Sequence, residues 1–371
     1  MTPKPIPIMA DAEAVACAAP DAPPILQNWT RLADLGDDLF TAVPPERQWL
    51  LRRLDKGGKH ERGVVPLGKV GIFAAAGGVG KTMASLQLAL SVATGKPWLG
   101  EHGFTVPAKC QGRVLLALGE EEIDEVRRRL FHAAQAMSLT EKDQLLARER
   151  VVVLPLAGKH VALTRAPNAD GVETDAAKAL RDKLHHEAGD EGWRLVVLDP
   201  LARFAGPEAE KDNAAATRFI ETIEQFCQVK GNPTVLVVHH SAQHARGGDP
   251  SKADPNRDAS QLARGATGIT DGARFVLTLE NERTTINDLR LERIAILKAP
   301  KTNLSPPLDG DVLLGRNPNN MGALFALDFG DTTRVKESRD EATRDRAQNR
   351  KKNKKPSDDE PEPEVEPSTW A

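Results

Sequence analysis

The feature that most constrains the fold of this 371-residue chain is a glycine-rich segment, AAGGVGKT, at residues 75–82. An apolar run precedes it at residues 71–76, and a helical pattern follows it at residues 83–93. A strand, a glycine-rich turn and a helix in this order form a phosphate-binding loop (P-loop), in which backbone N–H groups and the helix N-terminus surround phosphate oxygens. Ala75 stands where such a loop usually has its first glycine, and alanine is also small. The segment therefore predicts a nucleotide site in an α/β domain.

The residue types in this loop suit separate tasks in binding ATP and Mg²⁺. Glycines let the backbone turn its N–H groups toward phosphate. Lys81 is expected to reach the β- and γ-phosphates, and the Thr82 hydroxyl is expected to bind Mg²⁺. The predicted nucleotide contacts are Ala76, Gly77, Gly78, Val79, Gly80, Lys81, Thr82 and Met83.

Short apolar runs alternate with amphipathic segments between about residues 70 and 300. The expected strands span residues 71–76, 114–118, 195–198 and 235–238, and the expected helices span residues 83–93, 121–137, 176–186 and 214–229. Two later runs, residues 274–279 and 291–297, look like paired strands. This order predicts an α/β fold with a mainly parallel sheet flanked by helices and a β-rich C-terminal edge.

The composition along the chain predicts three regions. Residues 1–45 are rich in Pro, Ala and Asp and are expected to be an extended or disordered arm, in which residues 29–40 form one short amphipathic turn. Residues 46–330 are expected to form the ATPase domain. Residues 331–371 carry a basic block and then an acidic, Pro-rich run, which predicts a disordered charged tail. The tail is either a solubilising segment or a docking segment for a partner protein.

The overall composition excludes several classes of protein. The formal net charge is −3, so any contact with nucleic acid must come from local basic loops. Cys17, Cys110 and Cys227 are far apart and show neither metal-ligand spacing nor a disulfide framework, which favours a reducing cytoplasm. No apolar run approaches the ~20 residues of a membrane-spanning helix, so no membrane partner is expected.

Two acidic residues follow apolar runs downstream of the loop. Asp199 ends the run at residues 195–198, as the metal-binding aspartate of a Walker B strand does, and is expected to hold Mg²⁺. Glu120 follows the run at residues 114–118, which is expected to lie beside the P-loop strand. There its carboxylate would orient and deprotonate the attacking water. The alternative is that Glu120 belongs only to the acidic first turn of a helix.

Two histidines, His239 and His240, end the predicted strand at residues 235–238. A polar side chain at this point can sense the γ-phosphate and pass the change to the next loop, and His240 is the favoured candidate. A zinc site with His244 is the alternative, but no cysteine or acidic partner stands at ligand spacing. A structural role is the third interpretation for either histidine.

Four segments resemble the RecA-type ATPases, specifically the RepA-type hexameric replicative helicases of plasmids, over about residues 64–326. They are GRVLLALGEEEIDEVRRRL (112–130), LVVLDPLARF (195–204), VVHHS (237–241) and ARGATGITDGARF (263–275). This resemblance implies a RecA-like P-loop core with Glu120 as catalytic glutamate, Asp199 as Walker B aspartate and His240 as sensor. It alone implies that Arg274 is an arginine finger given to a neighbouring subunit and that Lys301 lies near the subunit interface.

The resemblance also implies a function. The Gly-, Asp- and Arg-rich loop at residues 243–264 would line the channel of a ring and contact the backbone of single-stranded DNA through Arg246, Lys252, Arg257 and Arg264. The predicted activity is an ATP-driven hexameric DNA helicase of plasmid or phage replication type that moves on single-stranded DNA. The alternatives are a RecA-like DNA-binding switch that does not unwind, and a small-molecule P-loop kinase, although no arginine-rich lid is evident.

Overall fold

The computed structural model describes residues 30–55, 58, 60–159, 161–165, 173–206, 208–209, 211–240, 267–282, 293–306, 308 and 310–353. The chain divides into two units, Met1–Arg47 and Gln48–Ala371. The described part of the first unit contains one 3-10 turn, η2 (Leu32–Leu35), within the stretch where the sequence predicts a short amphipathic turn. Trp29 and the rest of the predicted arm before it lie outside the described residues.

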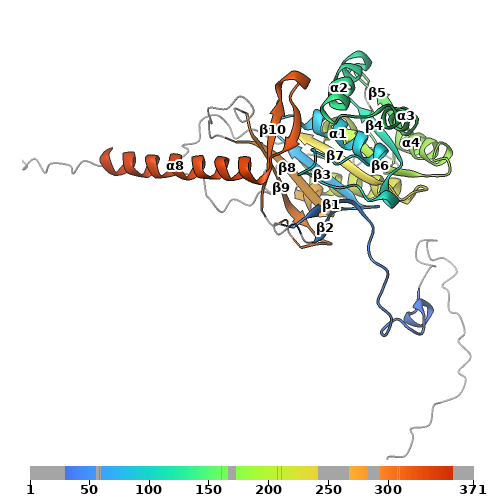
Figure 1. Ribbon diagram of the computed structural model, residues 1–371. Helices are drawn as coiled ribbons and strands as arrows, with labels where there is room; N and C mark the ends of the chain where they lie inside the picture. The colour runs from blue at the N-terminus through green and yellow to red at the C-terminus, as the bar shows by residue number, and fades with distance from the viewer. Residues whose placement is uncertain are drawn as a thin grey trace, which may run out of the picture. The chain divides into compact units, whose positions relative to one another are not determined.

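A nine-stranded sheet forms the centre of the second unit (Figure 1). Six of its strands are parallel, which agrees with the predicted mainly parallel sheet, although the sequence pattern predicted no strand at residues 151–155 and did not predict that the run at residues 274–279 is parallel. In spatial order they are β8 (Phe275–Asn281), β3 (Val70–Ala75), β7 (Thr234–His240), β6 (Trp193–Asp199), β4 (Arg113–Leu118) and β5 (Val151–Pro155). This order confirms the RecA-like architecture and corrects one detail, because β7 and β6 separate β4 from the P-loop strand β3.

An antiparallel edge completes the sheet beyond β8. It consists of β9 (Ala295–Thr302), β10 (Val312–Asn317) and β11 (Ala323–Ala326). The pairing of β8 with β9 confirms the predicted β-rich C-terminal edge, although β9 lies later in the chain than the predicted run at residues 291–297. The buried Gln87 side chain joins this edge to the helix after the P-loop, since its amide donates to Leu324 O at 2.9 Å and accepts from Leu324 N at 3.0 Å.

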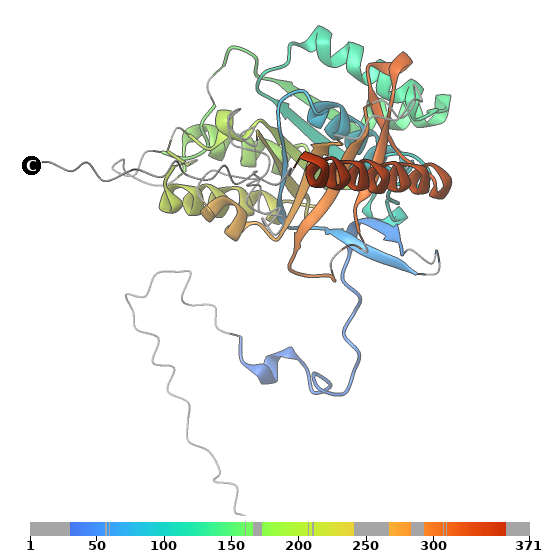
Figure 2. The ribbon, with the colours of Figure 1, turned by 90° about the vertical axis from the view of Figure 1, so that its left-hand side faces the viewer.

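Helices cover both faces of the sheet (Figures 1 and 2). Successive strand residues point to opposite faces, so Phe73 joins the cluster that contains α1 and α2, whereas Ile72 joins the cluster that contains α4 to α7. Both faces of the central strands are therefore apolar and buried, as a parallel sheet requires. The helices are α1 (Lys81–Thr94), α2 (Ile123–Ala136), α3 (Glu141–Arg150), α4 (Asp175–His186), α5 (Leu201–Phe204), α6 (Asn213–Glu224), α7 (Thr267–Gly272) and α8 (Phe329–Asn353).

An antiparallel hairpin that the sequence pattern did not predict precedes the P-loop strand. It pairs β1 (Trp49–Leu54) with β2 (Glu61–Pro66). Leu50 and Leu51 are fully buried in the same hydrophobic cluster as α1. The long stretch before the P-loop strand is therefore part of the folded core from Trp49 onward.

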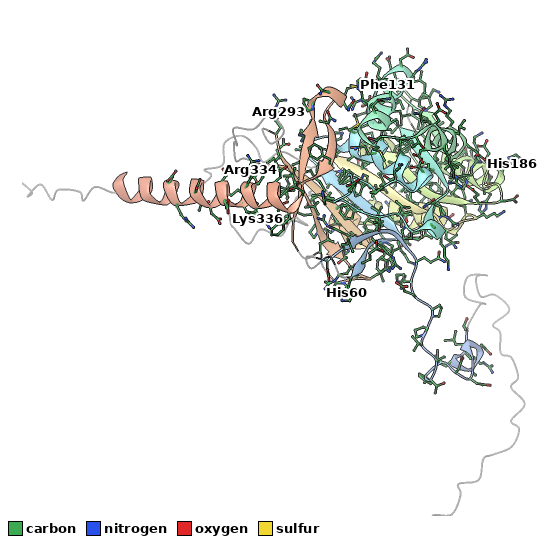
Figure 3. All side chains as sticks on the ribbon, in the orientation of Figure 1. His60, Phe131, His186, Arg293, Arg334 and Lys336 are labelled. Atoms are coloured by element: carbon green, nitrogen blue, oxygen red, sulfur yellow. The ribbon has the colours of Figure 1, made fainter. Side chains whose placement is uncertain are left out.

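The prediction of a disordered tail from residue 331 was wrong for residues 331–353, which form most of α8. This stretch contains no proline or glycine and many good helix formers, so the charge-rich composition does not oppose a helix. The buried Val335 anchors its first turns, and Arg339 pairs with Glu282 at 2.9 Å. Figure 3 shows Arg334 and Lys336 on this part of the helix. The acidic run lies outside the described residues.

Among the described helices, none is long and apolar enough to cross a membrane.

Candidate nucleotide-binding site

The predicted P-loop connects the carboxyl end of β3 to the first turn of α1. Gly78 and Gly80 have φ values of 75° and 105°, in the left-handed region that glycine tolerates best. A Cβ atom added at Gly77 or Gly78 would meet no atom within 4 Å, so space is open on this side of the loop. Such a cradle next to a helix N-terminus fits a phosphate group.

Lys81, the first residue of α1, folds back over the start of the loop. Its Nζ donates hydrogen bonds to Ala75 O at 2.7 Å and to Ala76 O at 2.9 Å. Burial lowers the pKa of Lys81, while the negative charges of Asp199 and Glu120 oppose that shift. The ammonium group is thus held at the mouth of the loop, where phosphate oxygens would offer it charged acceptors.

The two predicted metal residues lie together. Thr82 Oγ1 donates to Asp199 Oδ2 at 3.2 Å, although the residues are 117 positions apart. Burial raises the pKa of Asp199 from 3.8 to about 6, against the opposing effects of the Thr82 hydrogen bond and the Lys81 charge. A hydroxyl and a buried carboxylate side by side are oxygen ligands of the kind that Mg²⁺ prefers, and the cation would favour the ionised form of Asp199.

Glu120 and His240 also meet. His240 Nε2 lies 3.7 Å from Glu120 Oε2, and both side chains are about half exposed. Their strands, β7 and β4, flank β6, so the carboxyl ends of parallel strands gather these two residues and Asp199 at one edge of the sheet. The roles of catalytic base and sensor remain predictions, but the geometry separates Glu120 from a purely helical role, because α2 begins only at Ile123.

Gly119 sets the position of Glu120. Its N–H donates to Asp199 O at 2.6 Å, which ties the end of β4 to the end of β6. A Cβ at Gly119 would stand 2.7 Å from Cγ of Arg203. No sequence pattern predicted this role for Gly119, because the space for a side chain there is limited by Arg203, which follows β6.

The second histidine has a different environment. His239 is buried, with 3% exposure, whereas the His240 side chain faces the site. Within the described ranges, no group of three or more His, Cys, Asp or Glu side chains has the arrangement of a metal site. His244, the third ligand of the zinc alternative, lies outside the described residues.

Arg274 lies at the other end of the sheet from the P-loop. It precedes β8, and its N–H donates to Val70 O, at the amino end of β3, at 2.9 Å. The P-loop starts after Ala75, at the carboxyl end of the same strand. Five residue steps along a strand span roughly 17 Å. The exposed Arg274 side chain is therefore remote from the P-loop of its own chain.

Lys301 lies beside Arg274 and caps a helix. Its Nζ donates to Thr270 O at 2.7 Å and to Asp271 O at 2.9 Å, which are carbonyls at the C-terminus of α7. Burial lowers the pKa of Lys301, Asp271 opposes this shift, and the charge of Arg274 adds to it. Lys301 thus fixes the end of the helix that leads into Arg274, and its predicted place at a subunit interface remains a prediction.

The four basic residues predicted to contact DNA, Arg246, Lys252, Arg257 and Arg264, belong to the stretch of residues 241–266 that lies outside the described part of the chain. That stretch directly follows His240, so the proposed sensor and the predicted DNA loop adjoin in sequence.

Sequence reasoning missed Arg316, on β10. Its Nη2 donates to Val79 O in the P-loop at 2.7 Å. The two residues are 237 positions apart, and the only local signal is a single basic residue near the end of an apolar run. Only the folding of the antiparallel edge onto α1 brings Arg316 to the loop.

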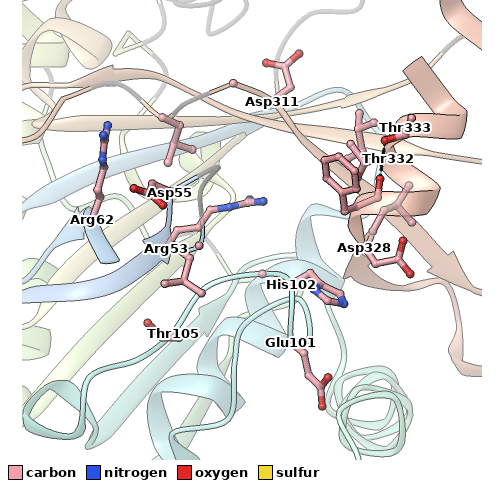
Figure 4. A pocket seen from close by; sticks show the side chains of 18 of the residues that line it. Arg53, Asp55, Arg62, Glu101, His102, Thr105, Asp311, Asp328, Thr332 and Thr333 are labelled. Atoms are coloured by element: carbon pink, nitrogen blue, oxygen red, sulfur yellow. Dashed lines mark hydrogen bonds between the residues drawn. The ribbon is translucent and has the colours of Figure 1, made fainter. Parts of the chain in front are cut away.

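A separate pocket of about 490 Å³ lies between the β1–β2 hairpin, residues 101–105 and the start of α8 (Figure 4). The Arg53 side chain extends from β1 toward its middle, and its guanidinium lies 5.3 Å from the centre of the Phe104 ring. The other charged or titratable residues that line it are Asp55, Arg62, Glu101, His102, Asp311, Asp328 and Lys336. None of the predicted nucleotide contacts lines this pocket, and its charges have both signs.

Residues 28–246 match the family model described as an AAA domain. Among solved structures, one ATPase domain is similar to 70% of this chain over 85% of its own length, with 14% identity and a TM-score of 0.47. A KaiC-like protein from Pyrococcus horikoshii is similar to 77% of this chain over 100% of its own length, with 12% identity and a TM-score of 0.43. Both TM-scores lie below 0.5, so the assignment rests on the family match and on the geometry of the site.

Proposed function

This chain belongs to the AAA domain family, and from that premise we propose that it is an ATP-driven DNA helicase of plasmid or phage replication type. It assembles as a hexameric ring, hydrolyses ATP at the interfaces between subunits and moves along single-stranded DNA. Membership of the family supports a P-loop ATPase, and the positions of individual residues support the ring motor.

The observation that carries this proposal is the separation between Arg274 and the P-loop. The backbone N–H of Arg274 bonds the first residue of β3, whereas the P-loop follows the last. Over roughly 17 Å of strand, Arg274 cannot reach a γ-phosphate bound by its own chain. An arginine that stabilises the charge of the transferred phosphoryl group must then act on a neighbour's nucleotide. A head-to-tail contact of this kind closes into a ring when the rotation between neighbouring subunits is a whole fraction of a turn, and the proposed hexamer is that case.

The residues at the carboxyl edge of the sheet support hydrolysis. Lys81 and the P-loop N–H groups would bind the phosphates, and Thr82 and Asp199 would hold Mg²⁺, which when bound would supply positive charge to the phosphate oxygens. The Glu120 carboxylate accepts a proton from water as the water oxygen attacks the γ-phosphorus. The bond from that phosphorus to the bridging oxygen breaks, and ADP leaves.

The contact between His240 and Glu120 links hydrolysis to movement. The pair lies at the site edge, 3.7 Å apart, and residues 241–266 follow His240 directly. Loss of the γ-phosphate changes what both side chains contact, and the change passes to this segment. Its basic residues Arg246, Lys252, Arg257 and Arg264 bind the DNA backbone, and such phosphate contacts do not depend on sequence. The segment has no Phe, Trp or Tyr to stack on bases.

Strand displacement tests this proposal. A forked DNA duplex with one labelled strand is incubated with ATP and either the wild type or Glu120→Gln. We expect the wild type to displace the strand and the variant to bind nucleotide without displacement. If the wild type hydrolyses ATP and binds single-stranded DNA but displaces no strand, the helicase is excluded in favour of a nucleotide-controlled DNA-binding switch.

A further inference from the structure

We propose that Arg316 is a positioning residue for the nucleotide, which acts by polarising the peptide unit between Val79 and Gly80 in the P-loop. The positive guanidinium group on the carbonyl oxygen of this unit strengthens its N–H as a donor to phosphate. The ligand is a nucleoside diphosphate or triphosphate, because a P-loop and its lysine contact the β-phosphate, which a nucleoside monophosphate lacks.

The contacts of Arg316 fix its guanidinium against the back of the loop. Nη2 donates to Val79 O at 2.7 Å and to Asn281 Oδ1 at 3.0 Å, and Nε donates to Arg293 O at 2.9 Å. A Cβ placed on Gly80 would stand 3.1 Å from Nη1, so the group also packs against the Gly80 backbone. The Arg316 guanidinium is thus fixed by three groups: Asn281 at the end of β8, the Arg293 carbonyl just before β9 and the Val79 carbonyl in the P-loop.

The geometry of the peptide bond turns this contact toward the nucleotide. A trans peptide is planar, and its C=O and N–H point in opposite directions. Since the Val79 carbonyl points to Arg316, the Gly80 N–H points away from Arg316. In a P-loop, such N–H groups bind phosphate oxygens. A hydrogen bond from a charged donor to the carbonyl polarises the amide. The hydrogen bond from Arg316 to the Val79 carbonyl therefore strengthens the hydrogen bond from the Gly80 N–H to phosphate.

Arg316 keeps its charge in this place. Burial and the neighbouring charge of Arg293 lower the pKa of Arg316, yet arginine stays protonated in proteins. The Arg293 side chain itself is exposed on the outer surface (Figure 3), and only its backbone carbonyl accepts from Arg316. A neutral side chain at position 316 could still hydrogen-bond the Val79 carbonyl, but it would not polarise the peptide unit by its charge. Nucleotide affinity can therefore distinguish a neutral from a charged side chain at this position.

The inference rests on nucleotide binding at the P-loop and is independent of ring formation and DNA binding. The experiment measures affinity for Mg²⁺–ADP by titration calorimetry and hydrolysis of ATP, for Arg316→Ala, Arg316→Lys and Arg316→Gln. Asn281→Ala and Arg293→Ala are the matched controls, because each alters the surroundings of Arg316 but leaves its bond to Val79. Thermal unfolding of each variant without nucleotide reports the structural effect separately.

We expect Arg316→Ala to weaken ADP binding about tenfold and to raise the KM for ATP similarly, with kcat changed less than threefold. Arg316→Lys, which keeps the charge but not the planar fork, should restore most of the affinity even where it does not restore thermal stability. Both controls should bind ADP within twofold of the wild type. Normal ADP binding by folded Arg316→Ala overturns the proposal. If Arg316→Ala does not fold, equal ADP affinities of the Lys and Gln variants overturn it, whereas tighter binding by the Lys variant supports it.

Discussion

His240 Nε2, at the end of β7, lies 3.7 Å from Glu120 Oε2, two residues beyond the end of β4, and β6 lies between these two strands. This contact joins the predicted catalytic carboxylate to the residue that precedes the predicted DNA segment. Neither side chain is fully buried, so both remain accessible to a ligand. A γ-phosphate with its attacking water would enter between or beside these groups, and the pair can therefore respond to the state of the nucleotide.

The first prediction concerns Glu120. In Glu120→Gln the amide cannot accept a proton from water, so ATP turnover should fall at least ~100-fold, while ADP affinity stays within about twofold. The measurement is steady-state phosphate release together with nucleotide titration. Glu122→Gln is the control, because Glu122 is exposed before α2 and bonds no helix N–H with its side chain. Equal losses in both variants would mean that the acidic turn matters only as a cluster of charge.

The second prediction concerns His240. His240→Ala should keep nucleotide binding but lose the acceleration of ATP turnover by single-stranded DNA, because the link from Glu120 to residues 241–266 is cut. Couplings of this kind typically change a rate or affinity by roughly 5- to 150-fold. His186→Ala, on the exposed C-terminal turn of α4, is the control. If DNA still accelerates His240→Ala as it does the wild type, His240 is not the sensor.

The third prediction concerns the charge of Asp199. Its pKa is about 6 in the folded chain against 3.8 as the ordinary value. Between these values the folded state keeps a proton that the unfolded state has released. The contribution of Asp199 to stability therefore decreases as pH rises from about 4 to about 6, and stays at its lower level above that.

Asp199→Asn removes the free-energy cost of ionising a buried carboxylate, and its amide oxygen can still accept a hydrogen bond from Thr82. Without Mg²⁺ and nucleotide, the variant should exceed the wild type in free energy of unfolding by up to about 3 kcal/mol at pH 7.5, and the difference should shrink toward pH 4. Urea unfolding at several pH values provides the measurement. The same variant should lose Mg²⁺-dependent hydrolysis. A wild type more stable than the variant at pH 7.5 would contradict the assigned burial cost.

The fourth prediction concerns packing at the end of β4. Gly119→Ala places a Cβ 2.7 Å from Arg203 Cγ, so Arg203 or the strand end must shift. Overpacking of this kind costs about 1–3 kcal/mol. In Gly77→Ala the new Cβ meets open space, and the nucleotide-free protein should lose less than about 0.5 kcal/mol. Denaturant unfolding of both variants tests this, and equal stabilities would show that Arg203 moves aside freely.

Local pattern is enough to predict the four inner strands of the parallel core, but it predicts no strand at β5 and does not predict that β8 is parallel. The apolar runs that form β4, β6 and β7 each carry a polar residue at or just after the carboxyl end, so Glu120, Asp199 and His240 can be named from the sequence, and the glycine-rich loop after β3 identifies Lys81. The order of the strands in the sheet cannot be predicted from local sequence patterns. For that reason the sequence predicts β4 beside β3, whereas two strands lie between them.

Contacts of high sequence separation account for the rest. Arg316 reaches Val79, and Gln87 reaches Leu324, each across 237 positions, and neither residue has a local signature of that role. The sequence pattern misses α8 for a different reason. Its charge-rich composition resembles that of disordered tails, but Val335 and the pair between Arg339 and Glu282 anchor its first turns to the core.

The most direct test of the central claim mixes two inactive variants, Arg274→Ala and Lys81→Met, and measures ATP turnover in the presence of single-stranded DNA. If Arg274 acts on the nucleotide of a neighbour, an intact P-loop of one variant meets an intact arginine of the other. Equal mixing should then restore about one quarter of the wild-type rate, the share of head-to-tail interfaces that combine both intact residues. A mixture as inactive as its two components, or Arg274→Ala alone at the wild-type rate, would contradict the ring motor.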